Sequence, residues 1–195
     1  MNQPSTFLVV RRLVPSLLGR GFTLTELLVV MAIVAVLATV GLPSMAAIIG
    51  SIRLSSASNV FLSNLHLARS EAIKRNSRVV LCKSADGISC AGTGGWEQGW
   101  IVFHDANNNS SLDSGEAVIE RARPLAGDLR FTGNFSVARY VSFVSTGATK
   151  LVSGSFQAGT LTLCRQSATG GEARQIIVNA VGRPRTQKVV VDTCV

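Results

Sequence analysis

The sequence predicts an α+β protein, in which one long N-terminal α-helix packs on a β-rich globular head. The first supporting observation is an apolar stretch from Phe22 to Leu42 that continues as an amphipathic pattern up to Arg75. The second is the series of short β-branched and aromatic runs that follows, separated by clusters of Gly, Asn and Ser. The chain has 195 residues, which is enough for one ordinary domain and an extension.

The apolar start of this helix predicts a membrane segment. No side chain from Leu27 to Ala38 is polar, and the stretch from Phe22 to Leu42 holds about 21 residues, a length that crosses a bilayer. Three arginines precede this stretch, so we expect the segment before the helix to stay on the cytoplasmic side. They are Arg11, Arg12 and Arg20.

The second half of the helix should pack on the head. Between Ile52 and Arg75, apolar residues recur every three or four positions and polar residues occupy the other angles. The apolar positions are Leu54, Ala57, Phe61, Leu65, Ala68 and Ala72. Asn76 is expected to end the helix.

Seven short segments of the head carry a strand pattern. They are Val79–Cys82, Trp100–Phe103, Ala117–Glu120, Tyr140–Val144, Thr160–Cys164, Gln175–Val181 and Val189–Val191. We expect Gln175–Val181 and Lys188–Cys194 to form an antiparallel hairpin, with GRPRTQ (182–187) as its loop.

Glu26 is unexpected near the start of a membrane segment, where a carboxylate is costly unless something compensates it. A free amino terminus a few residues away would compensate it, and this requires a cut between Gly21 and Phe22. The stretch from Arg20 to Leu27, RGFTLTEL, followed by the apolar helix, resembles the class III leader of type IV pilins and pseudopilins. The alternative is a plain signal anchor.

That resemblance implies three roles and three regions. A prepilin peptidase would cut after Gly21 and methylate Phe22, and Glu26 would pair with the N-terminus of a neighbouring subunit during assembly. The fourth residue after the cut is usually aliphatic in the family, and Thr25 departs from this pattern. The regions would be a cleaved leader (1–21), a long helix (22–75) and a β-rich head with a basic C-terminal hairpin (76–195).

The head extends the resemblance. The stretches LHLARSEAIKRNSRVVLC (65–82) and GWEQGWIVFHDANNNSSLDSGE (95–116), with the basic C-terminal hairpin, resemble the FimT/GspH branch of pilin-like proteins, closest to FimT-type minor pilins. This implies the pilin-like fold, other pilins as partners, and a single pass through the inner membrane with a periplasmic head. Assembly would carry the subunit into a surface pilus or a periplasmic pseudopilus.

Four cysteines allow two disulfides in an oxidising compartment. Local pairing, Cys82 with Cys90 and Cys164 with Cys194, is the favoured one of three connectivities. A metal site is the alternative, but it lacks a CxxC pair and nearby histidines. We therefore expect no metal and no cofactor.

The stretch DANNNSSLDSGE (105–116) imitates a calcium-binding loop. Its oxygen-bearing side chains fall at positions 1, 3, 5, 9 and 12 of the EF-hand pattern; they are Asp105, Asn107, Asn109, Asp113 and Glu116. Ser110 stands where the pattern needs glycine, and the flanks are β-like. A loop that joins two strands is favoured, and calcium binding stays open.

The sequence does not suggest an enzyme. The chain has two histidines, His66 on the long helix and His104 beside the Asn-rich loop, and no catalytic arrangement follows from their spacing. Trp96 and Trp100 are expected to pack the head.

The net charge of +8 suggests an anionic partner. Gly182, Arg183, Pro184 and Arg185 match the GRxR motif of DNA-binding members of the FimT branch, and Lys188 lies at the far edge of the predicted loop. The resemblance implies sequence-independent binding of double-stranded DNA phosphates for uptake in natural transformation. Arg165 and Arg174 are candidates for extending the patch. The alternative is a structural minor pilin or a type II secretion pseudopilin that does not bind DNA.

Overall fold

The structure is a computed structural model that describes residues 21–167 and 169–194, without the side chains of residues 40–44, 46 and 47. The chain divides into two compact units, residues 1–44 and 45–195. The helix α1 (Leu24–Arg75) contributes to both units. The predicted leader, apart from Gly21, lies outside the described residues.

The helix α1 begins and ends at capping motifs. Thr23 precedes its first turn and its Oγ1 accepts a hydrogen bond from the amide of Glu26 at 3.2 Å, in the Thr-x-x-Glu spacing of a capping box. At the other end Asn76 adopts a left-handed conformation with φ of 50°. The amides of Asn76 and Ser77 then donate to the carbonyls of Ile73 and Ala72, which is a Schellman motif. The predicted end of the helix at Asn76 is confirmed.

Within the described residues, no helix has both the length and the apolar character needed to cross a membrane. The membrane segment expected over Phe22–Leu42 stays a prediction, and the side chains of residues 40–42 lie outside the described part.

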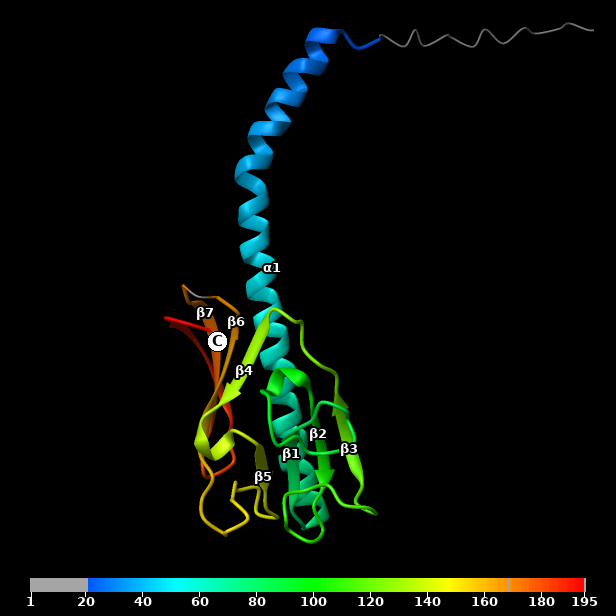
Figure 1. Ribbon diagram of the computed structural model, residues 1–195, viewed down its shortest axis with the longest axis vertical. Helices are drawn as coiled ribbons and strands as arrows, with labels where there is room; N and C mark the ends of the chain where they lie inside the picture. The colour runs from blue at the N-terminus through cyan, green and yellow to red at the C-terminus, as the bar shows by residue number, and fades with distance from the viewer. Residues whose placement is uncertain (1–20, 168, 195) are drawn as a thin grey trace, which may run out of the picture. The chain divides into compact units, whose positions relative to one another are not determined.

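The strands form two antiparallel sheets that flank the end of α1 (Figure 1). Sheet A has the order β3-β2-β1-β5 and sheet B the order β4-β6-β7-β8. The strands of sheet A are β1 (Val79–Lys83), β2 (Trp100–His104), β3 (Val118–Ala122) and β5 (Tyr140–Phe143). Those of sheet B are β4 (Leu129–Gly133), β6 (Gly159–Arg165), β7 (Gly171–Val178) and β8 (Arg185–Val191). Two short 3-10 turns, η1 (Trp96–Gln98) and η2 (Phe135–Val137), complete the described elements.

The apolar stripe of α1 joins the two sheets in one core. All six positions predicted for the stripe are buried, and they pack with residues of both sheets. Phe61 lies at the centre, with its ring 5.0 Å from that of Trp100 and 4.7 Å from that of Phe131 in edge-to-face contacts. Trp96 and Trp100 are fully buried, as expected of packing residues.

The α+β fold and the long helix are confirmed, and each of the seven predicted strands overlaps an observed one. The sequence prediction missed β4, whose two buried residues, Leu129 and Phe131, alternate with polar ones over only five positions. The predicted C-terminal hairpin was also shifted. The turn spans residues 179–184, and Arg185 already belongs to β8 and pairs with Ile177.

Candidate functional site

The turn between β7 and β8, residues 179–184, is here called the basic turn. Its backbone is closed by Asn179, whose carbonyl accepts a hydrogen bond from the amide of Gly182 at 2.9 Å. The Asn179 side chain accepts a second one, from the amide of Arg183, at 2.8 Å. Gly182 has a φ of 72°, a left-handed conformation that glycine adopts without strain.

The basic turn is docked against the segment that follows β5. Thr149, which is fully buried, donates its amide to the carbonyl of Ala180 at 3.1 Å and its hydroxyl to the carbonyl of Asn179 at 2.8 Å. A Cβ atom on Gly182 would overlap the carbonyl oxygen of Gly147. The backbone that carries the two arginines is therefore held from outside as well as from within.

This arrangement leaves both guanidinium groups at the surface. Arg183 and Arg185 are exposed, while Pro184 between them is buried. Neither arginine forms a salt bridge with any residue that the structure describes. A guanidinium on a fixed backbone loses less entropy when it binds, and it engages two phosphate oxygens at once.

Lys188 does not join this pair. Arg185 and Lys188 are three positions apart on β8, and residues at odd separations on a strand point to opposite faces. Lys188 is paired with Arg174 across the sheet. The pKa of the nearby Glu172 carboxyl is lowered mainly by its hydrogen bond from Arg174, with a smaller contribution from the charge of Lys188. The structure thus brings Gly182, Arg183 and Arg185 together and places Lys188 elsewhere.

The expected extension of the patch through Arg165 and Arg174 is wrong. Arg174 is buried, and its guanidinium binds Glu172 and the hydroxyl of Ser55, the latter at 3.0 Å, so it ties sheet B to α1. Arg165 is exposed at the opposite end of β6 from the basic turn and donates to Asp128 at 3.2 Å.

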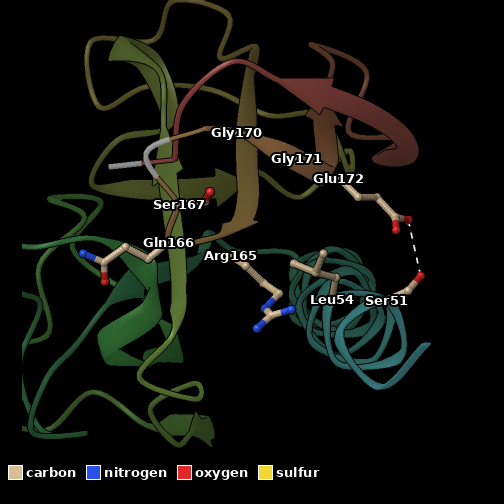
Figure 2. Close-up of a pocket in the computed structure, with 8 residues that line it drawn as sticks. All are labelled: Ser51, Leu54, Arg165, Gln166, Ser167, Gly170, Gly171 and Glu172. Atoms are coloured by element: carbon tan, nitrogen blue, oxygen red, sulfur yellow. Dashed lines mark hydrogen bonds between the residues drawn. The ribbon is translucent and has the colours of Figure 1, made fainter. Parts of the chain in front are cut away.

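Arg165 lines a polar cavity of about 390 Å³ beside α1 (Figure 2). The cavity lies between the helix and the turn from β6 to β7, and the hydroxyl of Ser51 donates to Glu172 at its edge. Since Arg165 and Glu172 carry opposite charges, the cavity favours neither an anion nor a cation.

In the acidic loop, residues 105–116, carboxylate oxygens accept hydrogen bonds from amides of the same loop. Asp105 is fully buried and accepts hydrogen bonds from the amides of Asn109 and Ser110, both at 3.0 Å. Glu116 accepts from the amides of Ala106 and Asp113. Within the described residues, no three His, Cys, Asp or Glu side chains are grouped as a metal site. These contacts are those of a self-contained loop joining β2 to β3.

Two carboxyls of the acidic loop have pKa values shifted in opposite directions. Burial raises the pKa of Asp105, against the hydrogen bonds from Ser110 and Asn109 that lower it. The side-chain amides of Asn107 and Asn109 donate to Asp113 and lower its pKa.

Both favoured disulfides are present. Cys82 is bonded to Cys90 and Cys164 to Cys194. The second bond connects the end of β6 to the segment after β8, where Cys194 also pairs with Ser167. It therefore fixes the base of the hairpin whose other end is the basic turn.

The residues expected to act in processing and assembly lie at the start of the described chain. Gly21, Phe22 and Glu26 are exposed, and Glu26 lies in the first turn of α1, where a negative charge favours the helix. Their roles in cleavage, methylation and subunit pairing stay predictions.

Sequence reasoning missed the residues that support the basic turn. Asn179 had a local signal, because Asx side chains commonly accept hydrogen bonds from amides in their own turn. Gly147 and Thr149 had none, because they meet the turn only through the folding of distant segments.

Comparisons with known proteins identify the family of the chain. The sequence model of the family described as Type II transport protein GspH matches residues 57–182. The model of the prokaryotic N-terminal methylation motif matches residues 19–42. Among curated protein sequences, none shows significant similarity.

Three solved chains match this structure. The type IV minor pilin FimU of Pseudomonas aeruginosa matches in two crystal forms. The first has a TM-score of 0.53 and 20% identity, and the match covers 73% of this chain and 95% of FimU. The second has a TM-score of 0.52 and 19% identity, covering 73% and 100%. The minor pseudopilin EpsH of the Vibrio cholerae type 2 secretion system has a TM-score of 0.48 and 12% identity, covering 69% and 96%.

Proposed function

The chain belongs to the GspH family of minor pilins and pseudopilins, and we propose that it is a type IV minor pilin that binds extracellular DNA through its basic turn. Binding would serve DNA uptake in natural transformation. The protein would then be a filament subunit with a binding surface and without catalytic activity.

One observation carries the proposal: two exposed arginines without ion-pair partners among the described residues stand on a backbone held by Asn179 and Thr149. Most surface arginines lose side-chain and backbone conformational entropy when they bind a phosphate. Here the backbone is already fixed, so only the side-chain entropy is lost. The contacts go to phosphates, so binding should be independent of sequence and weakened by salt.

The charge of the surrounding chain supports the same partner. From residue 129 to residue 191, which includes all of sheet B, the only acid is Glu172. The cations of this stretch are Arg130, Arg139, Lys150, Arg165, Arg174, Arg183, Arg185 and Lys188. Because Glu172 is bound to Arg174, no carboxylate of this stretch opposes a phosphate at the basic turn.

The N-terminal match implies processing by a prepilin peptidase and assembly with other pilins. We propose that the peptidase cuts between Gly21 and Phe22, that Phe22 is methylated, and that Glu26 pairs with a neighbouring subunit. The apolar segment would anchor the chain in the inner membrane, with the head in the periplasm, until assembly moves it into the pilus.

The test is DNA binding by the full chain in a non-ionic detergent, with a blunt-ended duplex as the probe. The variant R183Q/R185Q should bind at least roughly tenfold more weakly, since each bond to a charged group contributes about 1.5–3 kcal/mol. The matched control is R121Q/R123Q, which removes two exposed arginines of the same spacing at the end of β3. Equal binding by wild type and R183Q/R185Q would refute the proposal.

The family description favours a second candidate, a minor pseudopilin of a type II secretion system. In that case the two arginines would contact a neighbouring subunit or remain solvated. R183Q/R185Q would then retain any duplex binding, and it would lose co-purification with partner pseudopilins only if the arginines contact a subunit.

A further inference from the structure

Two aromatic side chains of the head are exposed without an evident structural reason. Phe135 in η2 is 100% exposed and Phe156, in the loop between β5 and β6, is 73% exposed. The other phenylalanines of the described globular unit, Phe61, Phe103, Phe131 and Phe143, are fully buried. Exposed aromatic rings that cluster on a surface commonly mark a binding site.

Hydrogen bonds connect Phe156 to the basic turn. The hydroxyl of Thr149, which binds the carbonyl of Asn179, also lies 2.6 Å from the carbonyl of Gln157. Phe156 precedes Gln157 and pairs with Lys150, the neighbour of Thr149. One threonine thus holds both the turn that carries Arg183 and leads into Arg185, and the loop that carries this ring.

A second set of bonds connects Phe135 to the same loop. The side-chain amide of Gln157 donates to the carbonyl of Ser136 at 2.9 Å. Asn134, on the other side of Phe135, donates its amide to the carbonyl of Thr160. Segments 134–136, 147–150, 156–160 and 179–182 therefore form one hydrogen-bonded group of turns at the end of sheet B, low in the view of Figure 1.

The charge around these rings is positive. Residues 129–171 contain no acid, and Arg139, between the two rings in sequence, is exposed. Beside this group, the carbonyl of Lys150 accepts a hydrogen bond from Arg78, and residues 109–111 of the acidic loop line a pocket with Arg139. Arg78 in turn lies 3.9 Å from Asp105, so that carboxylate faces a cation.

We propose that Phe135 and Phe156 stack on bases of single-stranded DNA whose phosphates are bound by Arg183 and Arg185. This rests on the proposed function and deepens it, because it names the strand state of the ligand. Aromatic rings stack on the exposed faces of unpaired bases, which a single strand offers along its length. Arginines bind the phosphates of duplex and single strand alike. A pilin contact would leave the acid-free, cationic surroundings of the rings unexplained.

The test compares two probes on the full chain in non-ionic detergent, an oligo-dT strand and a blunt-ended duplex of equal length. F135S/F156S should weaken oligo-dT binding by at least about fivefold, the smallest effect expected for losing one stacked ring, and leave duplex binding unchanged. The control I88S removes an apolar side chain that is 72% exposed in the Cys82–Cys90 loop, and it should change neither affinity.

The outcomes separate this inference from the proposed function. Loss of duplex binding in R183Q/R185Q with unchanged oligo-dT binding in F135S/F156S keeps the proposed function and overturns the stacking. Lost co-purification of pilins by F135S/F156S, with DNA binding intact, overturns it in favour of a subunit contact. The conservative F135Y/F156Y should retain oligo-dT binding, and F135S alone, at a fully exposed position, gives a variant whose folding is not at risk.

Discussion

The acidic loop and the basic turn are both irregular connections, yet they use their charges in opposite ways. In the acidic loop, Asp105 and Glu116 accept hydrogen bonds from the loop's own amides. In the basic turn, the backbone is closed by Asn179 and Thr149, and the arginines take no part in closing it.

The difference indicates which charges are available to a partner. A carboxylate whose oxygens already accept amide hydrogen bonds has fewer lone pairs free for a cation, and losing any of those bonds offsets the gain. Arg183 and Arg185 break no such bond with a described residue when they meet an anion. The same composition bias, many charges in a loop, thus has a structural role in one case and supports a binding role in the other.

The largest effect is expected from the disulfide at the base of the basic hairpin. C164S/C194S should lower the free energy of unfolding by about 3–4 kcal/mol, because the bond closes a loop with a sequence separation of 30. The Cys82–Cys90 bond, beside the acidic loop, closes a shorter loop with a sequence separation of 8. C82S/C90S should therefore lower the free energy of unfolding by about 2–3 kcal/mol. Urea unfolding followed by tryptophan fluorescence measures both, and a larger loss for C82S/C90S would contradict the ranking.

The next largest effect is expected from a substitution that disrupts the acidic loop. D105A removes a buried acceptor from two amides and a negative charge from beside Arg78, and should lower the free energy of unfolding by about 3 kcal/mol. D113A, on the exposed side of the same loop, is the control and should lose less than about 1 kcal/mol. Equal losses would show that the buried carboxylate does not organise the loop.

A smaller effect is expected from a substitution that disrupts the basic turn. G182A places a Cβ against the carbonyl of Gly147 and puts an alanine in a left-handed backbone conformation. It should lower the free energy of unfolding by about 2 kcal/mol. G115A, also left-handed at a φ of 97° but without a neighbouring atom, isolates the conformational part. G182A should also weaken duplex binding, since it displaces Arg183. Full binding by a destabilised G182A would show that duplex binding does not depend on the fixed backbone of the basic turn.

The smallest effect is on pH dependence within the acidic loop. The lowered pKa of Asp113 contributes stability above its unfolded pKa, and this stability is lost as pH falls through the folded value. The raised pKa of Asp105 acts in the opposite sense, because its contribution is present below the unfolded pKa and lost as pH rises through the folded value. Carboxyl NMR titration should find Asp113 below and Asp105 above the ordinary aspartate range; the reverse order would contradict the contacts described.

Local pattern was enough to predict α1, its buried stripe and its end at Asn76, because helix periodicity and caps are properties of short segments. It was also enough to favour the two disulfides. It did not predict the hairpin register, because the observed turn is held by Thr149, which is distant in sequence. For the same reason it grouped Lys188 and Arg174 with the motif, since the face of a strand follows from register and a shift of one residue reverses it.

The most direct test of the central claim is the salt dependence of duplex binding by the full chain. If Arg183 and Arg185 each hold one phosphate, R183Q/R185Q should reduce the slope of log affinity against log salt concentration by about 1.8, while R121Q/R123Q leaves it unchanged. An identical slope for wild type and R183Q/R185Q, or an equal reduction in both variants, would contradict phosphate binding by the basic turn.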